Sequence, residues 1–213
     1  MGKYDDLIPR GGQTGKPQSK VLGVGGSPRR GGNSDVLLKH VLKGVAEKDI
    51  TATGIHLRDF QYQGCVGCEQ CRRDKICTGL RDGVSLVYPA IVDSRGLILV
   101  SPTHNYNVTA WMKAFIDRLY CFYDFDNHRP RGWLSRLAGQ GRKAVVVAVC
   151  EQESKADMGF TLEAMRLPLE ALGYEIVAEL PAIGFFDRGK VKEEEALLAR
   201  ARQCGADLAD ALL

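Results

Sequence analysis

The sequence lacks several features that would place it in a class at once. No apolar stretch approaches the roughly 20 residues that a membrane-spanning helix needs. The formal net charge of +3 is too small to indicate nucleic acid or an anionic membrane surface as a partner. No internal repeat or low-complexity segment is present, which excludes solenoid and fibrous architectures. With 45% hydrophobic and 26% charged residues, we expect an ordinary soluble domain.

The N-terminal segment also lacks the apolar core of a signal peptide. Residues 1–19 are instead rich in Gly, Pro, Gln and Lys, which predicts a flexible or subunit-contacting arm. The length then favours one domain over residues 20–213. Without a targeting signal we expect a cytoplasmic protein, whose thiols stay reduced.

What the sequence does contain is a compact group of cysteines. Four fall within thirteen residues, with the spacing C-x2-C-x2-C-x5-C, at Cys65, Cys68, Cys71 and Cys77. Three thiolates at i, i+3 and i+6 on a tight backbone can converge on one small object, and iron–sulfur clusters with four cysteine ligands use runs of this kind. Cys77 is the least regular member, because its gap is five residues and no proline follows it.

Other interpretations of the cysteines stay open. Zinc also takes four thiolates, but its sites usually pair two separated knuckles, and no second Cys or His knuckle exists here. Disulfides are a third option, although a reducing compartment disfavours them, and the thiols can also be redox-active or incidental. The flanking residues Arg72, Arg73 and Lys75 would stabilise a reduced cluster or attract an acidic electron carrier, or they form an ordinary solvated face.

Elsewhere, short apolar runs alternate with stretches of helical periodicity. The apolar runs predict strands at 21–25, 49–57, 96–100, 143–149 and 174–180. The helical spacing predicts helices at 33–47, 83–93, 109–123, 158–172 and 192–212. This alternation indicates an α/β fold with a parallel sheet covered by helices on both faces. Five such units suit a doubly wound five-stranded sheet of order 2-1-3-4-5, with a Cys-rich insert at about 58–82 after the second strand.

In such a sheet ligands bind outside the carboxyl ends of the strands. The loop after the first strand is rich in Gly and Ser and leads into a helix N-terminus, which favours an anion. Ser27, Asn33 and Ser34 offer side-chain donors, and Arg29 or Arg30 can clamp phosphate oxygens. The loop lacks the Gly-Lys-[Ser/Thr] ending of a P-loop, and no acidic residue closes the second strand as a dinucleotide site requires. A mononucleotide phosphate fits better, the alternative being a Gly-rich turn with a simple N-cap.

The loop after the third strand is the second candidate region. It supplies backbone N–H groups and amides for a heteroaromatic edge, with His104 and Tyr106 as stacking surfaces. His104 is also the candidate for proton transfer, although a lone histidine is more often structural. In the helix that follows, Asp117 and Arg118 are expected to form an ion pair or to seat the helix.

These motifs resemble a known family. The run Gly-Ser-Pro-Arg-x-x-x-Asn-Ser at 26–34 and the run Ser-Pro-Thr-x-Asn at 101–105, followed by Lys-Ala-Phe-Ile-Asp-Arg at 113–118, are similar to those of the NADPH-dependent FMN reductase family. That family belongs to the flavodoxin-like superfamily. The cysteine insert makes the chain resemble the iron–sulfur flavoprotein branch of the family, over about residues 20–190.

The resemblance implies which residues bind cofactors. The FMN phosphate would lie on Ser27, Arg29, Asn33 and Ser34. The isoalloxazine edge would lie against Pro102, Thr103, His104, Asn105, Tyr106 and Asn107, with Glu151 of the charged loop after the fourth strand as a further contact. A 4Fe–4S cluster would be held by Cys65, Cys68, Cys71 and Cys77.

The implied function is an FMN-dependent oxidoreductase or electron-transfer flavoprotein that joins a flavin to a 4Fe–4S cluster. Its partners would be electron donors or acceptors such as NAD(P)H, ferredoxin or quinone, and relatives of this kind form homodimers or homotetramers. Two alternatives remain. One is an NAD(P)H-dependent FMN or quinone reductase whose cysteines form a dithiol or a zinc site. The other is a non-catalytic flavin- or metal-binding redox-sensing module.

The remaining irregular segment and cysteines are assigned mainly structural roles. Residues 124–141, with Trp133 and several arginines, are expected to form a solvated surface loop in preference to a cap over a flavin or a subunit. Cys121, Cys150 and Cys204 lie in apolar patterns and are expected to be structural, with Cys150 alone placed to approach a flavin.

Overall fold

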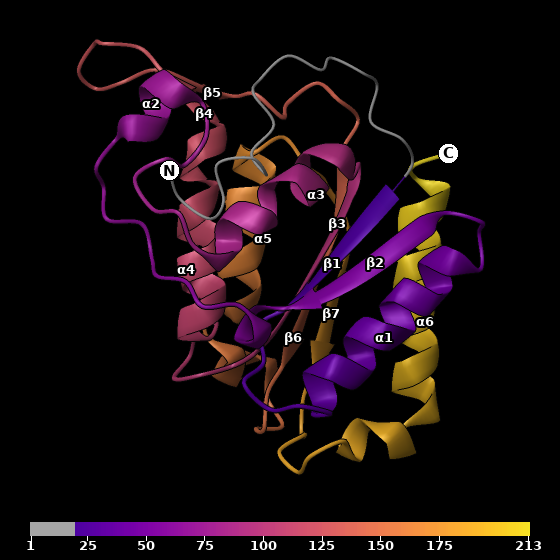
Figure 1. The fold of residues 1–213 in the computed structure, drawn as a ribbon. Helices are drawn as coiled ribbons and strands as arrows, with labels where there is room; N and C mark the ends of the chain where they lie inside the picture. The colour runs from indigo at the N-terminus through magenta and orange to yellow at the C-terminus, as the bar shows by residue number, and fades with distance from the viewer. Residues whose placement is uncertain (1–19) are drawn as a thin grey trace.

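The computed structural model describes residues 20–213, so the predicted arm at 1–19 lies outside the described residues. One parallel sheet consists of β1 (Lys20–Gly25), β2 (Thr51–His56), β3 (Gly96–Pro102), β6 (Lys143–Val149) and β7 (Glu175–Ala182). Its spatial order is β2-β1-β3-β6-β7 (Figure 1). Counted along the chain, these strands are the first to the fifth of the sheet, and the predicted order 2-1-3-4-5 is confirmed.

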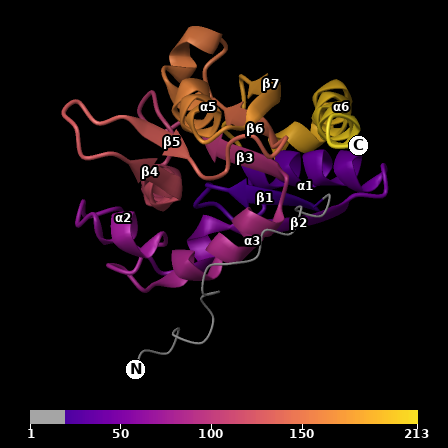
Figure 2. The ribbon, with the colours of Figure 1, turned by 90° about the horizontal axis from the view of Figure 1, so that it is seen from above.

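Side chains of the central strands alternate between two cores. On β3, Leu97 and Leu99 face one core whereas Ile98 and Val100 face the other, and all four are buried. The first core is covered by α3 (Tyr88–Asp93), α4 (Ala110–Arg118) and α5 (Thr161–Ala171), and the second by α1 (Asn33–Ala46) and α6 (Glu195–Asp210). Figure 2 shows α1 and α6 side by side, away from the other three helices. This two-sided burial explains the uninterrupted apolar runs.

Helices α1 and α6 cross at a pair of glycines. A Cβ atom at Gly44 would overlap with the backbone carbonyl of Arg202, and one at Gly205 would overlap with the carbonyl of Val41. Because the obstacles are backbone atoms, no side-chain movement can make room for a methyl group. The absence of side chains at both positions therefore sets how closely the two helices pack.

Shorter elements complete the chain. They are α2 (Gln70–Asp74) and the 3-10 turns η1 (Leu57–Asp59), η2 (Gly83–Leu86), η3 (Leu119–Phe122), η4 (Lys155–Met158) and η5 (Lys190–Glu193). Two predicted helices are accordingly divided, since η2 precedes α3 and η3 follows α4. Most of the predicted cysteine insert has no strand or helix other than the single short helix α2.

The segment expected to be a solvated loop contains an antiparallel hairpin. Its strands are β4 (Tyr123–Phe125) and β5 (Trp133–Ser135), and it lies beside α2 (Figure 1). Aromatic pairs stabilise it: the rings of Tyr123 and Trp133 meet edge to face with centroids 5.2 Å apart, and those of Tyr120 and Phe125 stack at 4.9 Å. Most of residues 124–141 are exposed, as expected for a surface segment, and Trp133 keeps 53% of its surface exposed. The prediction missed the hairpin within this segment.

Candidate functional site

The loop between β1 and α1, residues 26–34, forms a cradle for an anion. Helix α1 begins at Asn33 behind Gly32, and no described side chain caps it, so N–H groups of its first turn remain free. Ser27 and Ser34 are buried beside this helix start, with 4% and 2% of their surfaces exposed. Free N–H groups and the positive end of the helix dipole together favour a phosphate.

An ion pair behind the cradle fixes its shape. The guanidinium of Arg58 donates two hydrogen bonds to the Asp35 carboxylate, at 2.9 and 2.8 Å, and a third to the Ser27 carbonyl at 3.0 Å. The same carboxylate accepts the N–H of Gly31 at 2.8 Å. His56 lies 3.4 Å from it, but burial lowers the pKa of His56, against the opposing effect of Asp35. Arg58, and not His56, is therefore the cation that pairs with the Asp35 carboxylate.

A tight turn follows β3 and projects an aromatic side chain. The backbone of His104 exchanges two hydrogen bonds with Asn107, at 2.8 and 3.2 Å. Between them Asn105 and Tyr106 both have left-handed backbones, with φ of 51° and 64°, which is uncommon for a bulky residue. Tyr106 is 61% exposed. Strained residues of this kind cluster at ligand sites, so the turn fits a role in binding.

Thr109 joins this turn to the cradle. Its hydroxyl donates to the Gly26 carbonyl at 2.8 Å and accepts the N–H of Met112 at 3.1 Å, which caps α4. The Thr109 N–H donates to the hydroxyl of Ser101 at 3.2 Å. The loops after β1 and β3 are thus one hydrogen-bonded unit.

A cavity of about 130 Å³ opens between these loops. It is lined by Ser27, Pro28, Arg29, Gly32, Asn33, Ser34, Pro102, Thr103, His104, Val149, Glu151, Phe185, Phe186 and Arg188. Of the predicted flavin-contacting residues, Asn105, Tyr106 and Asn107 lie outside this lining, in the turn next to it. Phe185, Phe186 and Arg188 were missed. They follow the fifth strand of the sheet, and the rule that ligands bind at carboxyl ends of strands could have found them.

Two predicted phosphate ligands already have protein partners in this cavity. The Asn33 amide donates to the carbonyl of Asp187 at 3.0 Å and accepts the N–H of Val191 at 3.2 Å. The Arg29 guanidinium donates to the Phe186 carbonyl at 3.1 Å and lies over the Phe186 ring, 4.7 Å from its centroid. Both side chains therefore hold the segment that follows β7, while Arg29 keeps further donors free.

The four clustered cysteines are free thiols, and Cys65, Cys68 and Cys77 all lie near Cys71. Cys65 and Cys68 are exposed, and Cys71 and Cys77 are half-buried. Burial raises the pKa of Cys71, and the neighbouring thiols of Cys77, Cys65 and Cys68 raise it further. Within residues 20–213, no three Cys, His, Asp or Glu side chains already stand close enough together to hold a metal ion.

The backbone around two of these thiols leaves them little extra space. The N–H of Gly67 donates to the Cys65 sulfur at 3.5 Å, a contact of the kind that tunes sulfur ligands. A Cβ atom at Gly79 would lie 2.5 Å from the Cys68 sulfur, so a side chain there would displace the thiol. The donor set and its surroundings fit a sulfur-ligated group better than a random surface loop.

Arg118 of α4 binds both ends of residues 63–82, the cysteine segment. Its side chain is fully buried and pairs with Asp82 at 2.7 Å. It also donates to the carbonyls of Gln63 at 3.0 Å and Leu80 at 3.1 Å. Arg118 thus acts in seating the segment, whereas Asp117 pairs with Lys113 at 2.6 Å on the surface.

The hairpin holds the two ends of α2. Glu69 and Lys75 flank this helix, and both have left-handed backbones, with φ of 56° and 59°. Glu69 forms an ion pair with Arg131, which lowers the pKa of Glu69, and Lys75 pairs with Asp124. Ion pairs from one hairpin therefore accompany both strained positions.

These ion pairs also bear on the basic residues beside the cysteines. Arg72 bonds to Glu69 and to the carbonyl of Asp126, and Arg73 pairs with the adjacent Asp74. Lys75 is paired as described above. Each of the three basic residues thus has an acidic partner within the chain. Two of these partners are shared, since Glu69 also pairs with Arg131 and Asp124 also lies beside Arg136, so basic charge remains in excess around the cysteines.

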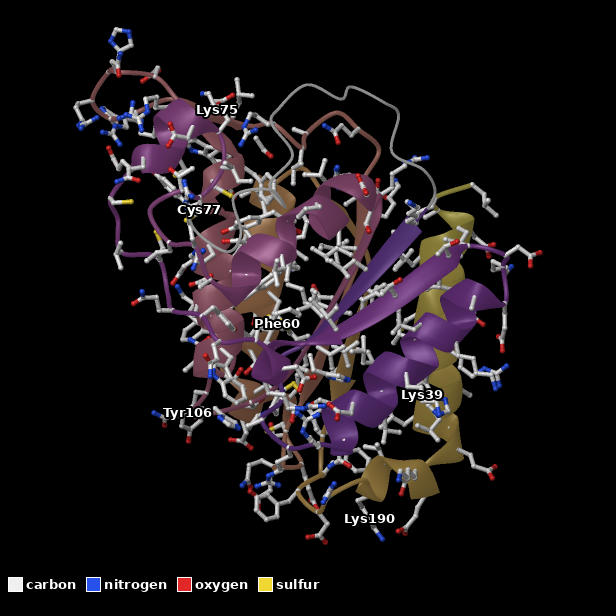
Figure 3. All side chains as sticks on the ribbon, viewed as in Figure 1. Lys39, Phe60, Lys75, Cys77, Tyr106 and Lys190 are labelled. Atoms are coloured by element: carbon white, nitrogen blue, oxygen red, sulfur yellow. The ribbon has the colours of Figure 1, made fainter. Side chains whose placement is uncertain are left out.

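The cysteine segment and the cavity occupy different parts of the folded structure. No residue of the insert at 58–82 lines the cavity. Figure 3 places Cys77 and Lys75 toward one end of the sheet, and Tyr106 and Lys190 toward the other. The chain after η1 runs back along α4 (Figure 1), so the four cysteines lie outside the cavity lining. The start of the insert does reach the cradle, because Arg58 donates to the Ser27 carbonyl and Asp59 pairs with Arg30.

The other cysteines are buried, as predicted. Cys121, Cys150 and Cys204 have 2%, 4% and 8% of their surfaces exposed. Cys121 lies near Cys77 and Cys71, and burial is the main reason that its pKa rises to about 12. Cys150 does not line the cavity, although both of its sequence neighbours do.

Comparison with known proteins relates this geometry to function. Residues 19–163 match the family of NADPH-dependent FMN reductases. An iron–sulfur flavoprotein of Archaeoglobus fulgidus is 31% identical over 193 residues, which is 90% of this chain and 80% of that protein. A second iron–sulfur flavoprotein, from Methanocaldococcus jannaschii, is 34% identical over 46% of this chain and 51% of its own length.

Solved structures support the fold. An NAD(P)H:quinone oxidoreductase from Methanothermobacter marburgensis has a TM-score of 0.67 and 21% identity, covering 89% of this chain and 98% of that one. A flavodoxin from the domain Archaea has a TM-score of 0.54 and 12% identity, covering 91% of this chain and 98% of its own. No helix in residues 20–213 has the length and apolar character to cross a membrane.

Proposed function

The chain belongs to the NADPH-dependent FMN reductase family, in its iron–sulfur flavoprotein branch, and from this membership we propose that it couples FMN to a 4Fe–4S cluster in electron transfer. FMN takes up two electrons as a hydride and releases them singly, whereas a 4Fe–4S cluster exchanges one electron at a time. The fitting partners are NAD(P)H as a two-electron donor, and ferredoxin or a quinone as a further donor or acceptor.

The cradle carries the FMN part of this proposal. The uncapped start of α1 opens on a cavity that Ser27, Arg29 and Ser34 line, which suits the phosphate. At about 130 Å³ the cavity is smaller than the roughly 300–1,000 Å³ of a typical ligand pocket, so it suits the phosphate and its chain. The isoalloxazine ring would then rest at the rim, along 102–107 and Glu151. His104, which lines the cavity, stays the candidate for proton transfer there.

The cysteine segment supports the cluster part. The thiols of Cys65, Cys68 and Cys77 lie near that of Cys71. The Gly67 N–H donates to the Cys65 sulfur, and the missing side chain of Gly79 leaves space for the Cys68 sulfur. These groups suit Cys65, Cys68, Cys71 and Cys77 as ligands. Hydrogen bonds to the sulfurs and partial burial are the means by which the protein would set the potential.

The separation of the two sites bears on assembly. Because none of the four clustered cysteines lines the cavity of its own chain, a second copy of the chain is one way to bring the two redox groups together. We therefore propose a homodimer or homotetramer in which the cysteine segment of one protomer approaches the cradle of its partner. Sedimentation of the native protein tests this, and a monomer that transfers electrons at full rate would contradict it.

The visible spectrum and the iron, acid-labile sulfide and flavin contents of anaerobically purified protein test the main proposal. We expect one FMN and about four iron atoms per chain, the stoichiometry of a 4Fe–4S cluster. Flavin without iron would leave a flavin reductase with a dithiol or zinc at the cysteines, and zinc analysis would tell these apart. Loss of both flavin and iron would contradict the proposal. With both present, reduction by NADH, NADPH or reduced ferredoxin identifies the donor.

A further inference from the structure

The segment after β7, residues 183–189, forms a wall of the cradle that the sequence motifs do not include. Resting on the FMN-binding role above, we propose that Arg188 binds the phosphate monoester of FMN, and that Phe186 orients Arg29 toward the same group. This adds a cation from the far end of the chain to a phosphate site otherwise built from the loop after β1.

The position of Arg188 over the cradle supports this role. A Cβ atom at Gly31 would lie 3.3 Å from Nη2 and 3.7 Å from Nε of Arg188, so the guanidinium rests on the bare backbone of the loop. Arg188 also lines the cavity and is exposed to solvent. Among residues 20–213 it has no ion-pair or hydrogen-bond partner. Its planar donors are therefore available for two phosphate oxygens at once.

Four contacts anchor the segment that carries Arg188. Asn33 bonds to the backbone on both sides of this arginine, at Asp187 and at Val191. Arg29 bonds to the Phe186 carbonyl and lies over its ring. The segment is consequently fixed to the start of α1, the same point at which the phosphate is expected. Figure 3 shows Lys190, which follows it, at the same end of the sheet as Tyr106.

The charge at the site calls for such a cation. A phosphate monoester carries about −1.5 to −2 at pH 7, whereas a helix N-terminus supplies only about +0.5. The cavity lining contains Arg29 and Arg188 as its cations and Glu151 as its carboxylate. Because Glu151 cancels about one of these positive charges, a single arginine and the helix would leave the phosphate incompletely neutralised, and the second arginine brings the site close to balance.

The test compares two flavins that differ only in the phosphate. Full-length protein freed of flavin is titrated with FMN and with riboflavin, with flavin fluorescence as the readout. We expect Arg188→Ala to weaken FMN about ten- to hundredfold, the scale of a charge-assisted hydrogen bond, and to leave riboflavin affinity unchanged. The FMN loss should shrink at high salt, and Arg188→Lys should recover part of it.

The matched control is Lys190→Ala, which removes a neighbouring charge that pairs with Glu193 and does not line the cavity. It should bind both flavins as the parent does. An equal loss for FMN and riboflavin in Arg188→Ala, or no loss, would overturn the inference. So would a raised KM for NADPH with unchanged FMN affinity, which would assign Arg188 to the nucleotide substrate. A parent protein that binds neither flavin would instead overturn the proposed function.

Discussion

The cradle and the cysteine segment are each expected to hold a redox group, yet they are held in place by different means. The cradle consists of strand ends and a helix start, and its loops are joined by backbone and hydroxyl hydrogen bonds. The cysteine segment has only one short helix, and charged side chains from α4 and the hairpin hold it. The fold thus organises most of the cradle, with the Arg58–Asp35 pair behind it, whereas the cysteine segment depends mainly on ion pairs.

This difference has energetic consequences. Exposed ion pairs such as Lys75–Asp124 contribute only about 0–1 kcal/mol each, and salt screens them. The buried guanidinium of Arg118 is different, because removing it strands Asp82 and two carbonyls. We therefore expect the cysteine segment to respond to single substitutions and to its own ligand more strongly than the cradle does.

Removal of a cysteine ligand should separate the two regions most completely. We expect Cys71→Ser to lose most of its iron and sulfide and to retain FMN, because none of the four clustered cysteines lines the cavity. Metal and flavin analysis of the same sample measures both. Cys204→Ser, which alters a buried thiol on α6, is the matched control and should keep its iron. Joint loss of iron and FMN from Cys71→Ser would mean that the two sites are not independent.

Arg118→Leu should give the next largest effect. Breaking a buried ion pair typically costs about 3–5 kcal/mol, and Asp82 would be left with no partner of comparable strength. We expect a clear fall in the free energy of unfolding, measured with urea, together with faster loss of iron. FMN affinity should change little.

The double variant Arg118→Leu with Asp82→Leu gives the control for this effect. It removes both charges, so part of the lost stability should return. If the double variant is as unstable as Arg118→Leu alone, the other bonds of the two residues matter more than the ion pair: those of Arg118 to the Gln63 and Leu80 carbonyls, and those that Asp82 accepts from the N–H groups of Gln63 and Val84.

Two glycines with nearly the same backbone offer a direct comparison of the regions. Gly31 in the cradle has φ of 66° and Gly67 in the cysteine segment has φ of 68°. Alanine at either should cost about 1–2 kcal/mol from the left-handed backbone. At Gly31 the new methyl group also crowds Arg188, whereas nothing lies within 4 Å at Gly67. Gly31→Ala should therefore weaken FMN, and Gly67→Ala should affect only iron retention. The reverse pattern in a flavin and iron assay would contradict this division.

The smallest effect is expected from the hairpin, and it should depend on pH. The neighbouring Arg131 lowers the pKa of Glu69 below its ordinary value of 4.5. A depressed carboxyl pKa stabilises the fold fully above the ordinary pKa, and that contribution is lost as the pH falls from the ordinary pKa through the lower pKa of the folded state. We expect Arg131→Gln to lose iron slightly faster than the parent at neutral pH, and the difference in unfolding midpoint to begin shrinking near pH 4.5 and to disappear below the depressed pKa of Glu69. An undiminished difference in acid would rule out the ion pair as its cause.

The sequence was sufficient for the sheet because its central strands β1, β3 and β6 are buried on both faces. A run such as residues 96–100 is apolar throughout for that reason, and the five runs yield the order that the structure has. The hairpin was not predictable in the same way. Each of its strands has three residues, which is too short for a period-two pattern, and arginines surround them.

The residues of the candidate site also differ in how far the sequence could predict them. Ser27, Ser34 and Arg29 fall in a contiguous motif, so the sequence alone could indicate them. Arg188 and Arg118 act through partners that are distant in the chain, such as Gly31 and Asp82. The separation of the cysteines from the cavity likewise depends on the path of a loop along α4, which no local pattern specifies.

The close packing of α1 against α6 at Gly44 and Gly205 couples the position of α1 to that of α6. The N-terminus of α1 belongs to the cradle, and at Gly44 the helix is locked backbone to backbone against α6. Neither helix can slide without losing this contact. Ligand binding at the start of α1 should therefore change the local stability of the C-terminal helix α6. FMN would then slow amide hydrogen exchange around Gly205 as well as around Ser34. Hydrogen exchange in the C-terminal helix would then report whether the cradle near the N-terminal end of the domain is occupied.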